Sequence, residues 1–130
     1  MRNIIRQKLD PKIIKTLCGR TTTLDGFELI VYAIYDKKTK ELLATLEYNA
    51  YLNKMIYLRQ LTVFEEYRKK GIGRQIISSF IKDMKSFIEY YDRIELEADN
   101  NSITFWLKCG FEMTNIMTSN RPRMVYYLRY

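Results

Sequence analysis

The sequence predicts a single α/β domain with a mixed β-sheet, in the element order β-α-β-β-β-α-β-α-β-β. Two observations support this fold class. Runs of β-branched and aromatic residues separated by turn sequences occupy much of the chain, which is typical of strands. The segment 72–91 instead places apolar residues three and four apart, the spacing of one helical face. A long helix between two strands favours a parallel crossover, so we expect both strand orientations in the sheet.

The first half of the chain is expected to form a strand, a short helix and a three-stranded meander. Asp10-Pro11 has the pattern of a helix N-cap followed by the first helical residue, and Gly19 is typical of the residue after a helix. In the third meander strand the aliphatic residues occupy even-numbered positions before Arg59-Gln60 and odd-numbered positions after it. Either a β-bulge at this point or a strand that is apolar on both of its faces would explain the change. The expected bounds are a strand at 3–9, a helix at 10–17, and strands at 27–35, 41–51 and 55–64.

The second half is expected to alternate helices and strands before it closes with a hairpin. Residues 99–102, Asp-Asn-Asn-Ser, are helix-capping residues, and Gly110 would end the helix that follows them. Residues 118–122 have the composition of a loop between the last two strands. The expected bounds are a helix at 72–91, a strand at 93–98, a helix at 103–108, and strands at 111–117 and 124–129.

Length and composition limit the classes of function. The 130 residues fit one domain, 1–130, and the absence of histidine excludes histidine-dependent triads and histidine-ligated metals. Cys18 and Cys109 lie far apart without a metal-ligand pattern, so no metal site is expected. The longest apolar run is too short for a membrane helix and the first residues lack a signal-peptide pattern, so we expect a cytoplasmic protein with no membrane partner. The net charge of +7 favours an anionic partner.

The segment 68–74, Arg-Lys-Lys-Gly-Ile-Gly-Arg, joins a predicted strand to the N-terminus of the long helix. Glycines let backbone N–H groups approach a ligand, a helix N-terminus has partial positive charge, and the cations add full charges. This combination suits a pyrophosphate. The alternative is an ordinary strand-to-helix turn with solvated cations, since the segment lacks both the Gly-Lys-Ser/Thr ending of Walker A and the pattern G-x-G-x-x-G.

Residues 68–73 resemble the acetyl-CoA loop of the GNAT superfamily of N-acetyltransferases, which reads Arg/Gln-x-x-Gly-x-Gly/Ala. The segment 61–67 is similar to the strand ending that precedes this loop in the family. The segment 99–111 resembles a second family motif, with an Asn-centred turn, the aromatic pair Phe105-Trp106 and a closing Gly-Phe. The order of predicted elements from 23 to 130 also resembles this family, which implies a GNAT-like mixed sheet.

The resemblance implies that acetyl-CoA is the co-substrate. Backbone N–H groups around Val63 would then pair with the pantetheine arm, and those of residues 69–74 would bind the pyrophosphate. Asn100 would touch the pantetheine near a helix cap, and Phe105 and Trp106 would form a wall of the acyl pocket. The expected cofactor-binding residues are Leu61, Thr62, Val63, Arg68, Lys69, Lys70, Gly71, Ile72, Gly73, Arg74, Asn100, Phe105 and Trp106.

Two departures from the family pattern concern catalysis. Trp106 stands where the family often places a tyrosine that acts as an acid toward the CoA thiolate, and an indole N–H is too weak an acid to replace it. The strand glutamate that is common in the family falls near Arg59, so the usual carboxylate base is missing there. Candidates for a water-mediated base are Tyr57, Glu47, Glu95 and Glu97, each of which also suits a solvated strand position. We take Tyr57 and Glu97 as the catalytic prediction.

These features predict an acyltransferase that moves an acetyl group from acetyl-CoA to an amine by direct attack in a ternary complex. The acceptor amine would be a small molecule, a peptide or a protein. Cys109 is better explained as a small buried residue than as the nucleophile of a ping-pong mechanism. One alternative is a catalytically silent acyl-CoA-binding domain. A basic nucleic-acid-binding module is less favoured, because the phosphates of CoA already account for the loop cations. We expect a monomer or a homodimer.

Overall fold

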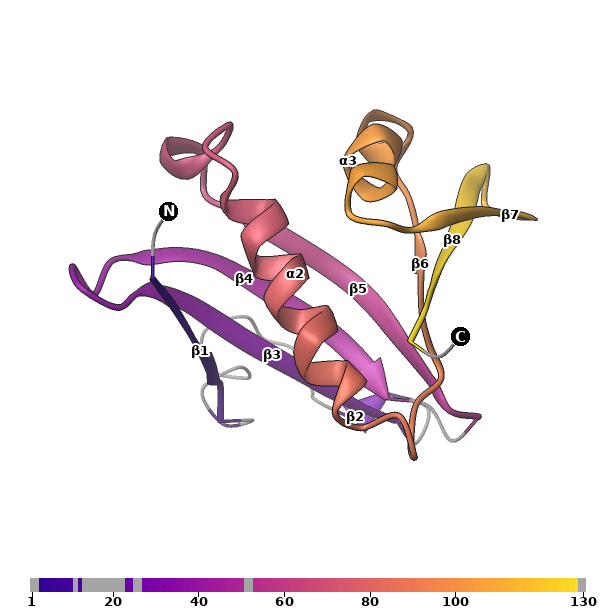
Figure 1. The fold of residues 1–130 in the computed structure, drawn as a ribbon, viewed down its shortest axis with the longest axis horizontal. Helices are drawn as coiled ribbons and strands as arrows, with labels where there is room; N and C mark the ends of the chain where they lie inside the picture. Colours follow the sequence, from indigo (N-terminus) through magenta and orange to yellow (C-terminus); the bar gives the residue numbers. More distant parts are fainter. Residues whose placement is uncertain (1–2, 11, 13–22, 25–26, 51–52, 129–130) are drawn as a thin grey trace.

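The computed structural model describes residues 3–10, 12, 23–24, 27–50 and 53–128, and Figure 1 shows how they are arranged. Two short 3-10 helices, Glu65–Tyr67 and Asn100–Ser102, precede the α-helices of the second half. The remaining elements are β1 (Ile4–Lys8), β2 (Thr23–Leu24), β3 (Phe27–Asp36), β4 (Leu42–Ala50), β5 (Met55–Val63), α2 (Ile72–Lys85), β6 (Arg93–Glu97), α3 (Ile103–Lys108), β7 (Glu112–Thr118) and β8 (Arg121–Tyr127).

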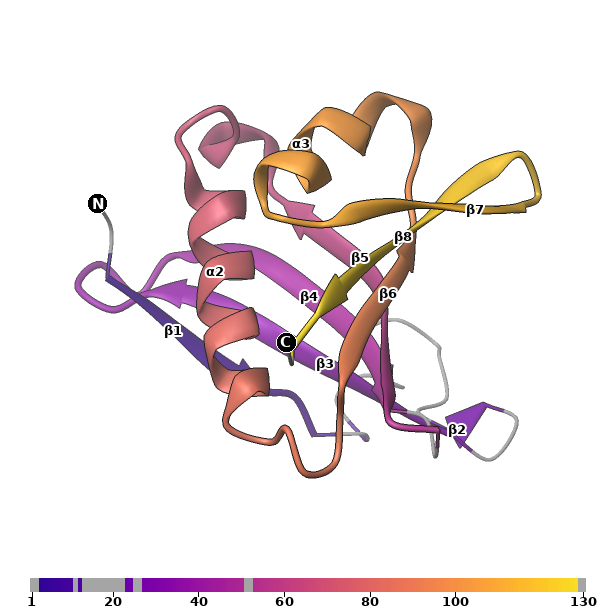
Figure 2. The same ribbon diagram turned by 45° about the vertical axis from the view of Figure 1, so that its right-hand side comes forward.

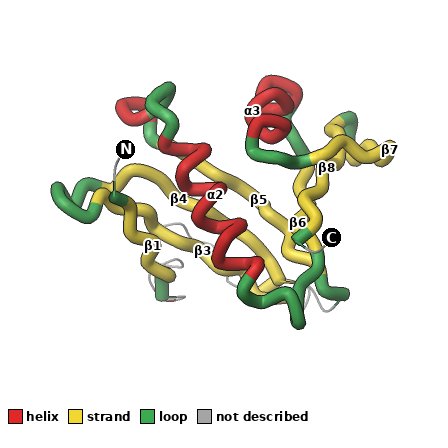
Figure 3. The backbone as a smooth tube through the Cα atoms, viewed as in Figure 1, coloured by secondary structure: helices red, strands yellow, loops and turns green. Residues whose placement is uncertain are grey.

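The strands form a mixed sheet in the order β1-β3-β4-β5-β6-β8-β7, with β2 paired to β3 beside this path. Every described pairing is antiparallel except that of β5 with β6, the two strands that α2 connects. Figure 3 shows this arrangement by element type, with α2 lying across the strands. The predicted α/β fold with a parallel crossover is therefore confirmed.

The apolar face of α2 covers the centre of the sheet. Its buried residues are Ile72, Ile76, Ile77, Phe80, Ile81 and Met84. They belong to one core cluster with sheet residues such as Leu46, Ile56 and Ile94, all fully buried. Each fully buried aliphatic or aromatic side chain contributes about 1.5–3 kcal/mol relative to exposure, so this face holds the helix in place.

The long helix ends earlier than its apolar spacing predicts. The prediction of a helix at 72–91 is wrong beyond Lys85, because Phe87 and Ile88 are 47% and 38% exposed rather than packed on the sheet. The Ser86 hydroxyl donates a hydrogen bond to the carbonyl of Asp83, which closes the helix with a tighter turn. The chain must then return to place β6 beside β5, so apolar residues continue although the helix does not.

Of the two explanations that the sequence left open for the change of parity in β5, the structure contains the β-bulge. Gln60 pairs with Glu47 and Leu58 pairs with Tyr48, which leaves Arg59 without a partner residue on β4. One extra residue in a strand reverses the direction of every side chain that follows it. The register therefore explains the change of parity that the sequence contains.

The last hairpin differs from the prediction. Residues 118–122 were expected to form a loop, but Ser119 and Asn120 alone make the turn, at φ values of 50° and 65°. A two-residue type I′ turn, whose twist matches that of the flanking strands, requires a positive φ at both of its central residues. Asparagine tolerates this conformation. As a result β8 begins at Arg121 instead of 124 and includes Pro122 at its start.

Near the N-terminus the predicted first strand is confirmed as β1, whereas β2 was not predicted. Asp10 Oδ1 accepts a hydrogen bond of 2.8 Å from the Lys12 N–H, the contact expected of a helix N-cap. The rest of the predicted helix at 10–17, and Gly19, lie outside the described residues.

Candidate active site

The strands β5 and β6 pair only at their beginnings and then separate. Their parallel register runs from Met55 opposite Arg93 to Tyr57 opposite Glu95. Beyond that point the edge of β5 that faces β6 has no strand partner among the described residues. Figure 2 shows this opening between the end of β5 and α3, with the beginning of α2 beside it.

The hydrogen bonds of β5 indicate which backbone groups face the opening. The Phe64 N–H donates to the Leu43 carbonyl on β4 at 3.0 Å. Because N–H groups of successive strand residues point to opposite sides, those of Val63 and Leu61 point toward the open edge. The Val63 carbonyl on that edge accepts a 2.8 Å hydrogen bond from Arg68 Nε. Strand N–H groups are thus available to a ligand in the opening.

The N-terminus of α2 lacks an internal cap. Gly71 is its N-cap residue, at φ 78° and ψ 5°, and no side chain caps the helix there. The first intrahelical bond runs from the Gln75 N–H to the Gly71 carbonyl at 3.1 Å. The N–H groups of Ile72, Gly73 and Arg74 therefore have no partner within the helix, and no acidic residue lies in its first turn. Such a terminus favours an anion.

The loop before α2 is anchored at both sides. The Tyr67 hydroxyl donates to Glu41 Oε2 at 2.5 Å, which fixes the loop to the beginning of β4. Lys69 adopts φ 61°, a conformation that is uncommon outside glycine and asparagine. Lys69 and Lys70 are both exposed, so their ammonium groups add positive charge near the uncapped helix end.

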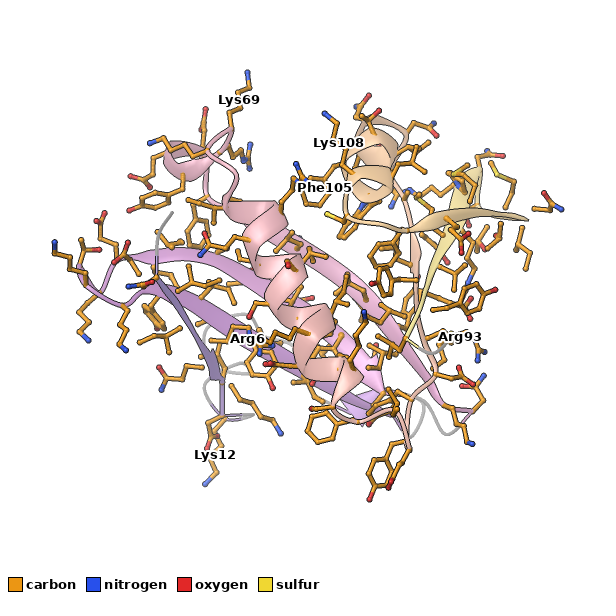
Figure 4. All side chains as sticks on the ribbon, viewed as in Figure 1. Arg6, Lys12, Lys69, Arg93, Phe105 and Lys108 are labelled. Carbon is orange, nitrogen blue, oxygen red and sulfur yellow. The ribbon has the colours of Figure 1, made fainter. Side chains whose placement is uncertain are left out.

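Helix α3 forms the opposite wall of the opening. A Cβ atom built at Gly73 would lie 3.1 Å from Phe105 Cε1, so only glycine lets the two helices approach this closely. Figure 4 shows Lys69 on the loop before α2, with Phe105 and Lys108 together on the side of α3. A pocket of about 430 Å³ is lined by Val63, Tyr67, Arg68, Lys69, Gly71, Ile72, Gly73, Arg74, Thr104, Phe105 and Lys108.

Most residues predicted to bind the cofactor are brought together here. Eight of them line this pocket, and Lys70 lines a larger groove that adjoins it. Leu61 and Thr62 lie on β5, where the Thr62 hydroxyl accepts a 2.9 Å hydrogen bond from Gln60 Nε2, and Asn100 is exposed in the 3-10 helix before α3. Their cofactor contacts stay predictions.

Sequence reasoning missed Tyr67, Thr104 and Lys108 as lining residues. Lys108 lies three and four positions after Phe105 and Thr104, which places the three on one face of a helix. That spacing, applied to the predicted helix at 103–108, could have identified Lys108.

Trp106 lies behind the pocket wall rather than on it. It is 8% exposed and packs edge to face against Phe105, with ring centroids 4.9 Å apart, and against Phe111 at 5.4 Å. It lines neither the pocket nor the larger groove. In the structure its position is that of a core residue that supports Phe105.

Cys109 is half-buried where α3 ends and lines the larger groove. Burial raises the pKa of its thiol to about 11, and the charge of Arg74 opposes this only in part. A thiol with this pKa is almost entirely protonated at neutral pH, and the thiolate is the nucleophilic form. This favours the small buried residue over the ping-pong nucleophile.

Tyr57 and Glu97, the two predicted catalytic residues, are hydrogen-bonded to each other. Burial and the neighbouring Glu97 carboxylate raise the pKa of Tyr57, while Arg123 and Arg59 act in the opposite direction. Arg123 also stacks over the Tyr57 ring, 5.2 Å from its centroid. Tyr57 therefore stays protonated and donates to Glu97, which lies at the end of β6 beside the opening.

Glu95 is held by two arginines. Its carboxylate accepts from Arg93 Nε at 2.6 Å and from Arg123 Nε at 2.7 Å. Burial acts to raise the pKa of Glu95, but the hydrogen bonds from both arginines outweigh it and lower the pKa. A carboxylate held this way is a poor proton acceptor, so Glu95 is less suited to act as a base than Glu97. Glu47, the fourth candidate, is half-buried on β4 opposite Gln60.

In the described part of the chain, no group of three or more acidic, cysteine or histidine side chains is arranged to hold a metal ion. None of the helices in the same residues is long and apolar enough to cross a membrane.

Comparison with known proteins identifies the family and agrees with the fold. A family model described as the GNAT acetyltransferase family matches residues 9–111. The fold is similar to that of a mutant spermidine/spermine N-acetyltransferase SpeG from Vibrio cholerae, with a TM-score of 0.73 and 12% identity over 97% of this chain and 95% of the other. No curated protein matches the sequence.

Two further solved structures were described as complexes with CoA. An acetyltransferase from Bacillus subtilis has a TM-score of 0.64 and 19% identity over 89% of this chain and 82% of its own. The PaiA N-acetyltransferase from Thermoplasma acidophilum has a TM-score of 0.63 and 19% identity over 76% of this chain and 60% of its own. At these identities the likeness concerns the fold. The match of the family model over most of the chain shows that this protein belongs to the GNAT acetyltransferase family.

Proposed function

We propose that the protein transfers an acetyl group from acetyl-CoA to an amine by direct attack within a ternary complex. The observation that supports this most strongly is the uncapped N-terminus of α2 beside the open edge of β5. The former suits a pyrophosphate, and the latter offers N–H and carbonyl groups to an amide-containing arm. A cofactor with both parts, such as CoA, would fit the two features together.

The transfer step needs little beyond positioning. The lone pair of a neutral amine attacks the thioester carbonyl carbon, and the oxygen that becomes negative needs a hydrogen-bond donor. The Val63 N–H points into the opening and is suited to this role. The C–N bond then forms fully, the C–S bond breaks, and the sulfur leaves with its electron pair.

Proton transfer is assigned to Glu97 and Tyr57. Glu97 takes the proton that the acceptor amine must lose, through a water molecule, and Tyr57 orients the Glu97 carboxylate by donating to it. The leaving thiolate needs no strong acid, because an ordinary thiol has a pKa of about 8.5 and leaves readily near neutral pH. Burial of Trp106 is therefore compatible with catalysis.

The acceptor class is an amine borne by a small molecule, a peptide or a protein. We place the reaction in the cytoplasm, in a single domain spanning 1–130 that acts as a monomer or a homodimer.

A catalytically silent acyl-CoA-binding domain is the second candidate, favoured by Arg59 at the bulge, where the family often has a carboxylate.

Release of free CoA from acetyl-CoA in the presence of a panel of amines tests the proposal. We expect turnover with at least one amine and, for that amine, a loss of about 10²-fold in kcat for Glu97→Gln. Tyr57→Phe should cost less, since the carboxylate remains. Glu112→Gln, an exposed glutamate on β7, serves as the matched control. Binding of acetyl-CoA without turnover of any amine would favour the silent domain, and absence of binding would exclude both.

A further inference from the structure

A second and larger groove continues from the pocket along α2. It has a volume of about 1180 Å³ and lies between α2 on one side and the end of α3 with Tyr126 of β8 on the other. Five cations line it, Lys70, Arg74, Lys82, Lys85 and Lys108. No carboxylate belongs to the lining, and in the described part of the chain none of the five takes part in an ion pair.

The cations extend beyond the reach of a pyrophosphate at the helix N-terminus. A helix rises 1.5 Å per residue, so Lys82 and Lys85 lie about 12 Å and 16 Å along the axis from Arg74. Both are exposed, and the Lys85 ammonium lies 5.6 Å from the centroid of the Tyr126 ring. The loop therefore does not account for the whole basic surface, and the preference for CoA over nucleic acid that the sequence suggested concerned the loop cations alone.

The composition of the groove favours a phosphate chain over an acidic polypeptide. Ser78, Ser79 and Gln75 supply neutral hydrogen-bonding groups between the cations. Ile72 and Ile81 are only 2% and 6% exposed, and Tyr126, an aromatic residue of the lining, is half-buried with the Lys85 ammonium 5.6 Å from its ring centroid. Protein–protein interfaces are depleted in charge at their core and use aromatic anchors, whereas nucleic-acid interfaces are more polar and more positive. A recess of this size admits a few nucleotides of one strand rather than a duplex.

We propose that the groove along α2 binds single-stranded nucleic acid through its sugar-phosphate backbone, at Lys82 and Lys85 together with the cations nearer the loop. This function is additional to acetyl transfer and does not depend on it. Binding would be independent of sequence and sensitive to salt, because phosphate contacts release counterions. CoA would compete only in part, since it occupies the end of the groove at Arg74 and leaves the end at Lys85 free.

Fluorescence anisotropy with a labelled 12-nucleotide single-stranded RNA, and with DNA of the same sequence, tests this proposal. The double variant K82Q/K85Q should bind at least tenfold more weakly than the unchanged protein. The slope of log K against log salt should fall by about 1.4, the value for two single-strand phosphate contacts. The matched control K37Q/K38Q removes the same charge from the exposed turn between β3 and β4, and should change the affinity less than twofold.

Three outcomes would overturn the proposal. The first is no binding of either oligonucleotide at about 50 mM salt. The second is an equal loss for K82Q/K85Q and for K37Q/K38Q, which would indicate attraction to net charge alone. The third is tighter binding of a polyglutamate peptide of equal charge than of RNA, which would assign the groove to an acidic protein. Thermal shift with acetyl-CoA should be unchanged in K82Q/K85Q, which separates this groove from the cofactor pocket.

Discussion

The two helices that border the pocket begin in different ways. The helical segment that ends in α3 begins with the 3-10 helix Asn100–Ser102, whose N-cap residue is Asp99; its Oδ1 accepts a hydrogen bond of 3.3 Å from the Asn101 N–H, so a side chain of the protein satisfies a free donor. At the beginning of α2, Gly71 supplies no such group, and cations replace acidic residues in the adjoining loop. A helix that is capped internally has less need of a ligand, whereas an uncapped one retains donors for an anion.

This difference has a cost for stability. Glycine at the N-cap weakens a helix by only about a few tenths of a kcal/mol relative to serine, asparagine or aspartate. In α2 the buried side chains of Ile76, Ile77 and Phe80, each at most 1% exposed, offset this loss through contacts with the sheet. The core therefore maintains a helix whose first turn can be reserved for binding.

The largest effect is expected when a side chain is added at the uncapped end. Gly71 lines both cavities, and a Cβ atom there meets nothing within 4 Å, so a longer side chain would occupy the space meant for phosphate. Gly71→Asn should weaken acetyl-CoA binding by at least about tenfold, or ~1.4 kcal/mol, measured by calorimetry. Asparagine tolerates the φ of 78°, so the melting temperature should change little.

Gly71→Val should lower stability as well as affinity, because a β-branched side chain is strained at a φ of 78°. Unchanged affinity in the asparagine variant would contradict the placement of phosphate at this helix end.

A smaller effect is expected for Gly73→Ala, which alters the contact between the two helices. The new methyl group would press on the Phe105 ring at 3.1–3.2 Å, and this ring can shift into the pocket. We expect a few-fold loss of acetyl-CoA affinity. Alanine is favoured over glycine within a helix by roughly 0.8–1 kcal/mol, so stability should hold or rise. Affinity restored by the second change Phe105→Leu would show that the ring transmits the effect.

The capped helix should respond in the opposite way. Asp99→Ala removes the side-chain acceptor at the beginning of the 3-10 helix Asn100–Ser102, which leads into α3, and should cost about 0.5–1 kcal/mol of stability, measured by urea unfolding. Acetyl-CoA affinity should stay within twofold. Asp99→Asn, which can still cap, should be close to the unchanged protein. A large loss of affinity in the alanine variant would mean that Asp99 contacts the cofactor, against the contrast between the two helices.

These contrasts also indicate what the sequence could predict. The parity of the aliphatic residues at Arg59 left a bulge and two apolar faces as alternatives, and only the strand register decided for the bulge. Elements with strong local signals were predicted correctly. The end of α2 was not, because Phe87 and Ile88 continue the helical spacing while tertiary pairing of β6 with β5 draws the chain away. The loop motif identified residues 68–74, but only the packing of α3 on α2 shows that Lys108 faces them.

The placement of Trp106 illustrates the same limit. Its position in the motif suggested a pocket wall, and no local rule distinguishes two adjacent aromatic residues in a short helix. Phe105 lines the pocket and Trp106 enters the core because the sheet lies on only one side of α3. The hydrogen bond between Tyr57 and Glu97 was equally hidden, since it joins two strands that are 40 positions apart in the sequence.

The last prediction concerns the C-terminal end of α3, where Cys109 approaches Arg74 of α2. Because burial raises the thiol pKa to about 11, the thiolate fraction at pH 7 is about 10⁻⁴, and alkylation should be roughly 10²-fold slower than that of a free cysteine. In a Cys18→Ser background, the rate with iodoacetamide should rise about tenfold per pH unit from 7 to 9. Acetyl-CoA should protect the thiol a few-fold, since it would occupy the shared end of the groove. Rapid alkylation at pH 7 would contradict the buried thiol and reopen the nucleophile hypothesis.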